Sequence, residues 1–130
     1  VPQVSYEDIG GLTDEIKKVR EMMARAHLFW HCSAYESFGI VIVEAMMCAL
    51  PVVVANSPGA FDVTNGGAQG RLFESGDVGQ LIKLSIDLII KDKNRHREGE
   101  KLRTYAMKKF SWENHMASMT EFWQLSIGKY

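Results

Sequence analysis

The sequence predicts an α/β fold in which helices cover a short parallel sheet, and three observations support this class. Two short apolar runs, at residues 27–32 and 51–55, have the composition of buried parallel strands. The segment between them is long enough for a helix, so the order is strand, helix, strand. From residue 78 onward the chain has the pattern of helices. Such a crossover is typical of a parallel sheet that is covered on both faces.

The size and charge of the chain exclude several functional classes. With 130 residues, 46% of them hydrophobic and 24% charged, the chain fits one globular domain. A formal net charge of -1 gives no reason to expect a nucleic acid or an anionic membrane as a partner. No apolar run approaches the roughly 18 residues of a membrane span, and no signal peptide is evident at the N-terminus. We therefore expect a cytoplasmic protein.

The cysteines and histidines do not have the spacing of a metal site. Cys32 and Cys48 each lie in an apolar stretch, so we expect buried free thiols in a reducing compartment. His27 and His31 are four positions apart, which brings side chains together only on a helix, whereas this run is predicted as a strand. We expect no metal. His31, near the end of that strand, is instead a candidate for lining a ligand pocket close to Glu36.

The first helix is expected over residues 14–26, after Thr13 as N-cap and with two acidic residues in its first turn. Its apolar positions recur at spacings of three and four and should cover the sheet. These positions are Ile16, Val19, Met23 and Ala26.

Caps, turns and periodicity define the elements that follow. A helix is expected over residues 37–49 with Ser37 as its N-cap, between the two predicted strands. The further expected elements are a short helix at 60–64, a brief strand at 71–73, and helices at 78–90, 94–110 and 112–127, the last with Ser111 as its N-cap.

The start of the helix at 37–49 is the best candidate for a binding site. Glu36 precedes it and Glu44 lies within it, so two carboxylates bracket a glycine and an apolar run. The first backbone N–H groups of a helix lack partners and favour an anion, and ligands of open α/β sheets bind at the carboxyl ends of the strands. The expected donors are the amides of Phe38, Gly39 and Ile40. The alternative is that Glu36 and Glu44 are ordinary solvated residues.

This stretch and its surroundings resemble the donor-binding half of family 4 glycosyltransferases with the GT-B fold. The resemblance covers residues 24–130 and rests on a strand, Glu-x-Phe-Gly, a second glutamate followed by Ala-Met, and a Pro-Val-Val strand. The matching residues are Glu36, Phe38, Gly39, Glu44, Ala45, Met46, Pro51, Val52 and Val53. Phe110-Ser111-Trp112 is similar to the element that opens the last helix of the family.

The resemblance implies a partial Rossmann-like fold and a retaining, metal-independent transfer of a sugar from a nucleotide-sugar, without a cofactor. It implies that Glu36 is the catalytic residue against the transferred sugar and that Glu44 contacts the ribose. The backbone around Ser37, Phe38, Gly39 and Ile40 is implied to hold the diphosphate-sugar.

The chain also departs from the family pattern. Ser57-Pro58-Gly59 stands where relatives usually have a Gly-Gly pair, and Asp62 stands near the place of a glutamate, without a role assigned to it. In the family, an upstream Arg and Lys neutralise the donor diphosphate, and no residue in the first 35 matches that element. The acceptor domain of the family has no counterpart in these residues either. We therefore expect that the isolated chain does not transfer sugar.

Residues 1–22 resemble the segment that opens an AAA+ ATPase module, so we divide the chain into a lead-in at 1–23 and a donor-binding domain at 24–130. The chain is then a chimera. The alternative is a divergent glycosyltransferase lead-in, because a helix normally precedes the strand at residue 27. No phosphate-binding loop follows, so ATP hydrolysis is not expected.

A second functional hypothesis is a non-catalytic, chimeric or scaffold α/β protein that self-associates. It follows from the apolar residues of the predicted last helix, which lacks a partner domain to pack against. These residues are Trp112, Phe122, Trp123 and Leu125. The basic residues between positions 91 and 109 are interrupted by acidic ones, so we interpret them as a solvated helix face rather than a nucleic-acid site.

Overall fold

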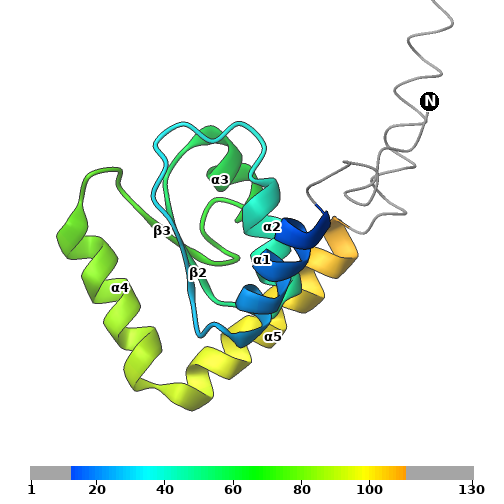
Figure 1. Ribbon diagram of the computed structural model, residues 1–130. Coiled ribbons are helices and arrows are strands. Elements are labelled where there is room, and N and C mark those ends of the chain that lie inside the picture. Colours follow the sequence, from blue (N-terminus) through cyan, green and yellow to red (C-terminus); the bar gives the residue numbers. More distant parts are fainter. Residues whose placement is uncertain (1–12, 111–130) are drawn as a thin grey trace, which may run out of the picture.

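The computed structural model describes residues 13–110, which form five helices and three strands (Figure 1). The elements are α1 (Thr13–Arg25), β1 (Phe29–His31), α2 (Ile40–Met47), β2 (Val52–Ala55), α3 (Pro58–Val63), β3 (Arg71–Phe73), α4 (Val78–Ile90) and α5 (Asp92–Lys109). The α/β class with a short parallel sheet is confirmed. The predicted helix at 112–127 and most of the AAA+-like segment lie outside the described residues.

The sheet has the order β1-β2-β3, and both neighbouring pairs are parallel. Trp30 is paired with Val53, and Val54 with Leu72, so the strands are aligned with their carboxyl ends at one edge. All four residues of the central strand β2 are buried, which explains its continuous β-branched composition. The carboxyl edge of this sheet is the place where the loops of an α/β domain gather.

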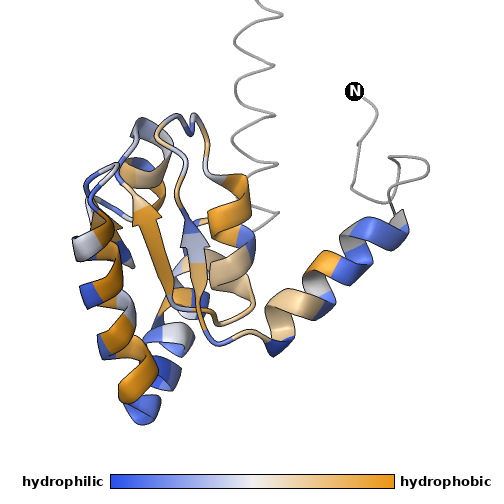
Figure 2. Ribbon diagram, turned by 60° about the vertical axis from the view of Figure 1, so that its left-hand side comes forward, coloured by the Kyte–Doolittle hydropathy of each residue, from blue (hydrophilic) through white to orange (hydrophobic). Residues whose placement is uncertain are grey.

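Helices cover both faces of the sheet, as the crossover predicts. Figure 1 shows α4 on one side of the strands and α1, α2 and α5 on the other. Figure 2 shows strongly hydrophobic residues along β2 and α4. Two hydrophobic cores result, and the larger one lies under α2 and α5. The fully buried residues of this larger core include Ile42, Met46, Val52, Val54, Leu102 and Ala106. The core under α4 consists of Val53, Ala55, Phe73 and Leu88.

Most predicted elements are present, with shifted ends. The strands are shorter than the apolar runs that predicted them, because residues 27, 28, 32 and 51 lie outside the pairing. The short helix α3 begins at Pro58, two residues earlier than predicted, because Ser57 caps it by accepting a hydrogen bond from the amide of Ala60 at 3.3 Å. Proline suits the first helical position because it has no backbone N–H, and an N–H at this position would have no partner within the helix.

Two expectations about burial are wrong. Of the predicted stripe on α1, Met23 is buried, whereas Val19 is 47% exposed and Ala26 lies beyond the helix and is exposed. Cys32 is exposed and Cys48 is half-buried, because Cys32 follows the end of β1 instead of lying within it. Within residues 13–110, no helix is long and apolar enough to cross a membrane.

Candidate functional site

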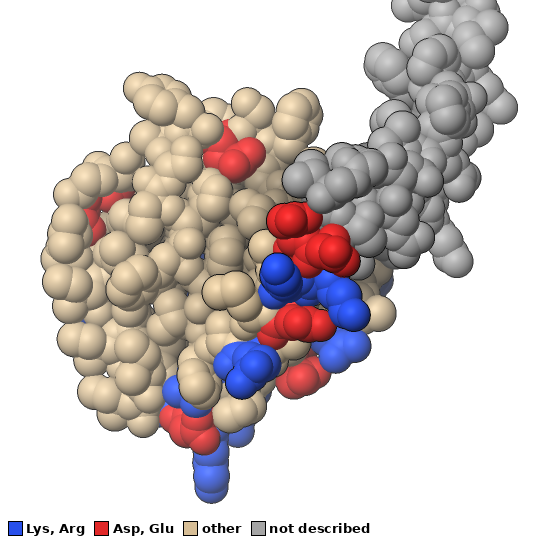
Figure 3. Space-filling model, in the orientation of Figure 1, with Lys and Arg blue, Asp and Glu red and all other residues tan. Residues whose placement is uncertain are grey.

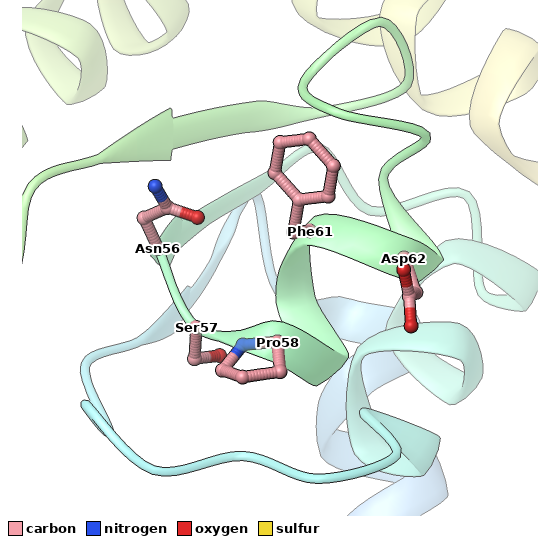
Figure 4. A pocket seen from close by; sticks show the side chains of 5 residues that line it. All are labelled: Asn56, Ser57, Pro58, Phe61 and Asp62. Carbon is pink, nitrogen blue, oxygen red and sulfur yellow. The ribbon is translucent and has the colours of Figure 1, made fainter.

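Of the residues predicted to bind a ligand, those from Glu36 to Gly39 lie in the loop of residues 32–39, which joins β1 to α2 at the carboxyl edge of the sheet, whereas Ile40 and Glu44 lie in α2. This loop passes beneath the turn that begins α3, as Figure 4 shows. Two loops from neighbouring parallel strands therefore meet where ligands of open α/β sheets bind.

Glu36 folds back onto the backbone of its own loop. Its Oε1 atom accepts hydrogen bonds from the amide of Gly39 at 3.1 Å and from the amide of Phe38 at 3.3 Å. These donors lower the pKa of Glu36, Gly39 contributing the most and Phe38 the next most. A carboxylate held in this way stays charged at neutral pH.

This geometry corrects the prediction that Ser37 caps the helix. The helix α2 begins at Ile40, and its N-cap is Gly39, which has a left-handed backbone with φ of 70° and no side chain to cap with. A helix cannot include a residue in that conformation, so it starts three residues later than the propensities indicate. The exposed side chain of Ser37 makes no cap hydrogen bond.

Because α2 begins at Ile40, the amides that lack an acceptor differ from those predicted. The amides of Phe38 and Gly39 are used by Glu36, whereas those of Ile40 and Val41 precede the first bonds within α2. In the described part of the chain these two amides have no acceptor. Phe38 is 78% exposed and Ile40 58%, so the start of the helix is accessible from solvent.

A close contact between two backbone segments holds the loop in place. The amide of Gly59, in α3, donates to the carbonyl oxygen of Glu36 at 2.7 Å. A Cβ atom at Gly59 would lie 2.6 Å from that oxygen and 2.8 Å from the amide nitrogen of Phe38. Only glycine allows this approach, which explains why a glycine stands at position 59.

Glu44 lies on α2, four residues after Ile40 and about 6 Å further along the helix axis. The two residues share the helix face opposite the buried Ile42 and Ala45, and helical side chains lean toward the N-terminus. Among the described residues, the half-buried carboxylate of Glu44 has no hydrogen-bond partner. The structure thus places Glu36 in the loop before α2 and Glu44 about one turn into the helix.

An open hollow of about 380 Å³ lies beside the same turn. Asn56, which follows β2, lines it together with Ser57, Pro58, Phe61 and Asp62, and Figure 4 shows Asn56 and Asp62 at opposite ends of this set. Asn56 was missed by the sequence analysis. The signal was available, because a polar residue directly after a buried parallel strand lies at the binding edge.

Positive charge is sparse around this edge. Within residues 13–110, the only basic side chain paired with Glu36 is that of His31, with 3.3 Å between Nε2 and Oε2. Figure 3 shows Lys and Arg side chains over α1 and α5 and none over the part of this face that contains α3. No group of three His, Cys, Asp or Glu side chains in the described range is placed to hold a metal ion.

Comparisons with known proteins agree on one family. Its model, described as Glycosyl transferases group 1, matches residues 10–105. The chain is 35% identical over 96 residues to N-acetyl-alpha-D-glucosaminyl L-malate synthase of Bacillus anthracis, covering 73% of this chain and 25% of that protein. It is 33% identical over 109 residues to alpha-maltose-1-phosphate synthase of Mycolicibacterium smegmatis, covering 79% of this chain and 28% of that protein.

A solved structure is also similar to this chain. The crystal structure of Anabaena HepE in complex with UDP-glucose matches 87% of this chain and 38% of that chain, with a TM-score of 0.63 and 27% identity. The chain spans about a quarter of the length of the curated relatives it matches.

Proposed function

Because the chain belongs to the Glycosyl transferases group 1 family, we propose that its carboxyl edge binds the nucleotide-sugar donor of a glycosyl transfer reaction. The observation that carries the proposal is the start of α2, where a charged glutamate and two amides without an acceptor in the described range lie beside the exposed residues Phe38 and Ile40 at one edge of a parallel sheet. The similarity to a structure in complex with UDP-glucose supports this class of ligand.

The proposed roles follow from chemistry and position. The amides of Ile40 and Val41 bind a phosphate oxygen, because the start of a helix carries partial positive charge. Glu36 accepts a hydrogen bond from a sugar hydroxyl, since carboxylate oxygens are acceptors only. Glu44, one turn along the helix, accepts from the ribose hydroxyls. The reaction proposed for the whole enzyme retains the anomeric configuration and needs no metal.

We also propose that the 130 residues, as an isolated chain, bind a donor weakly and do not transfer its sugar. In the described range, no Lys or Arg side chain forms an ion pair at this edge, and a leaving nucleoside diphosphate gains negative charge in the transition state. Cations from elsewhere are required for transfer. The substrate is the nucleotide-sugar itself, with no separate cofactor.

Titration with UDP-, GDP- and ADP-sugars tests the site. We expect the amide resonances of Ile40, Val41 and Phe38 to shift with one of these ligands in nuclear magnetic resonance spectra, and Glu44→Gln to weaken binding. Glu100→Gln, at an exposed position of α5, is the matched control and should bind as the unmodified chain does. Shifts confined to residues away from α2 and α3 would contradict the site.

A self-associating scaffold remains a second candidate, and one observation favours it. Large aliphatic side chains are exposed along one side of α4, at spacings of three and four. They are Val78, Ile82, Ile86, Ile89 and Ile90. Light scattering distinguishes the candidates, because a stable dimer that ignores all the nucleotide-sugars would favour the scaffold.

The AAA+ origin of residues 1–22 stays a prediction, and so does the chimera. The family match begins at residue 10 and therefore overlaps the second half of that segment. Deleting residues 1–22 tests it. We expect this deletion to lower stability, because Met23 at the end of α1 is buried in the core and the helix would be cut short. A loss of nucleotide binding without a loss of stability would support the AAA+ origin.

A further inference from the structure

His31 is the last residue of β1, and its side chain is 14% exposed. Its Nε2 atom lies 3.3 Å from Oε2 of Glu36. The other ring nitrogen, Nδ1, is buried and has no hydrogen-bond partner among the described residues. The ring of Phe29 stacks against the imidazole, with 6.3 Å between the ring centroids and 24° between the planes.

These contacts assign the tautomer of the histidine. The carboxylate of Glu36 is an acceptor only, so its position 3.3 Å from Nε2 favours a hydrogen on that nitrogen. A hydrogen on Nδ1 would be buried without an acceptor, which is costlier than a buried lone pair on an imidazole nitrogen. A hydrogen on Nε2 and a lone pair on Nδ1 satisfy both conditions.

The contacts around Glu36 leave Oε2 available to a ligand. The amides of Phe38 and Gly39 donate to Oε1. Among the described residues, Oε2 has only Nε2 of His31 beside it, at 3.3 Å. Because each carboxylate oxygen has about two lone-pair positions, Oε2 can accept from a hydroxyl group of a ligand.

We propose that His31 is a positioning residue that orients Glu36, so that the site prefers a sugar-bearing nucleotide to the bare nucleoside diphosphate. This inference rests on the proposed function. Without His31, no described side chain contacts Oε2, so the carboxylate is oriented less firmly and its acceptor oxygen faces a wider range of directions. The phosphate contacts at Ile40 and Val41 do not involve His31 and stay unchanged.

The test compares UDP-glucose with UDP by calorimetry, in the full chain and in two variants. We expect the unmodified chain to prefer UDP-glucose and His31→Leu to lose most of that preference, a change on the order of tenfold, with UDP affinity unchanged. His31→Gln should restore the preference to within about threefold, because its amide donates from nearly the same place. His96→Leu, at an exposed position of α5, is the matched control.

A spectroscopic readout of the ligand-free chain accompanies the titration. The imidazole ¹⁵N shifts of His31 should show a hydrogen on Nε2, and the amide resonances of Phe38 and Gly39 should move in His31→Leu but not in His96→Leu. Circular dichroism confirms that the variants fold.

The outcomes separate the two proposals. If neither UDP nor UDP-glucose binds to the unmodified chain, the proposed function is overturned and the inference falls with it. If both bind but His31→Leu keeps the preference for UDP-glucose, or loses both affinities equally, the inference alone is overturned. A hydrogen on Nδ1 in the ligand-free chain would also overturn it.

Discussion

Two clusters in this molecule hold carboxylates by different means. At the carboxyl edge, Glu36 is held by two backbone amides and one imidazole. On the face covered by α4, Arg71 of β3 contacts Asp87 of α4 at 3.0 Å and Glu98 of α5 at 3.2 Å. Lys91 adds a second cation on Asp87 at 2.7 Å. We refer to these as the Glu36 cluster and the Arg71 cluster.

The difference separates binding from structural support. The pKa of Asp87 is lowered by hydrogen bonds from the side chains of Lys91 and Arg71, so each of its oxygens already faces a cation. The pKa of Glu36 is lowered chiefly by the backbone amides of Gly39 and Phe38, with a smaller contribution from His31, and in the described range its Oε2 faces no Lys or Arg side chain. A carboxylate paired with cations between elements ties the fold together, whereas one held by amides at a loop remains available to a ligand.

The largest expected effect comes from Gly59→Ala, which breaks the Glu36 cluster through the backbone. The new Cβ would lie 2.6 Å from the carbonyl oxygen of Glu36, so the loop must move. We expect a loss of about 1–3 kcal/mol in the free energy of unfolding, as for other overpacked sites, together with a loss of nucleotide-sugar binding.

Gly79→Ala is the control for this substitution. Its Cβ would meet only Oδ1 of Asp77, at 3.5 Å, which is an ordinary contact on helix α4. We expect Gly79→Ala to be neutral or slightly stabilising, because alanine favours a helix more than glycine does. Denaturant unfolding measures both variants, and equal stabilities would contradict the close contact at Gly59.

The next effect comes from Arg71→Met, which breaks the Arg71 cluster while keeping much of the side-chain volume. Asp87 and Glu98 lose their shared partner, which joins β3 to α4 and α5. We expect the midpoint of thermal unfolding to fall by about 4 °C and nucleotide-sugar affinity to stay unchanged. Arg103→Met, on the exposed side of α5, should have little effect on either.

A smaller effect on the fold and a clear effect on binding are expected from Glu36→Gln. The glutamine keeps a carbonyl oxygen for the amides of Phe38 and Gly39, but it presents an NH₂ group where Oε2 accepted a hydrogen bond. We expect a small fall in the unfolding midpoint at neutral pH, because the amides stabilise the charged carboxylate, and a fall in UDP-glucose affinity on the order of tenfold. A large loss of stability would place Glu36 with Asp87 as a structural carboxylate.

The smallest expected effect is a difference in how pH and salt act on the two clusters. Both carboxyl groups have lowered pKa values in the folded state, from ordinary values of 4.5 for Glu36 and 3.8 for Asp87. Each therefore adds stability above that ordinary value, and the added stability is lost as the pH falls through the folded pKa.

Salt should separate the two groups. Screening weakens the cation contacts of Asp87, so its pKa should rise toward 3.8 between about 0.05 and 1 M salt. The short amide hydrogen bonds of Glu36 are less sensitive, so its pKa should rise less. Carboxyl ¹³C titration at both salt concentrations measures this, and a larger salt response at Glu36 would contradict its assignment to backbone dipoles.

Much of the fold was predictable from local patterns. The β-branched run at β2 predicted a buried strand, and the predicted helix at 78–90 has the bounds of α4 in the structure. The start of α2 was not predictable in the same way, because Ser37 is a good N-cap by type, whereas the left-handed backbone of Gly39 delays the helix. The side chain of Glu36 takes the amides that a Ser37 cap would have left open.

By itself, the sequence determined the α/β class and the order of the elements, which depend on periodicity, propensity and spacing over a few residues. The family resemblance rests instead on the motif residues around Glu36 and Glu44. Only the tertiary structure decided that Gly59 contacts the Glu36 carbonyl and that His31 reaches the Glu36 carboxylate. Those contacts form because parallel strands bring separate loops to one edge, where backbone distances of a few ångströms, set by packing rather than by local sequence, determine which partners meet.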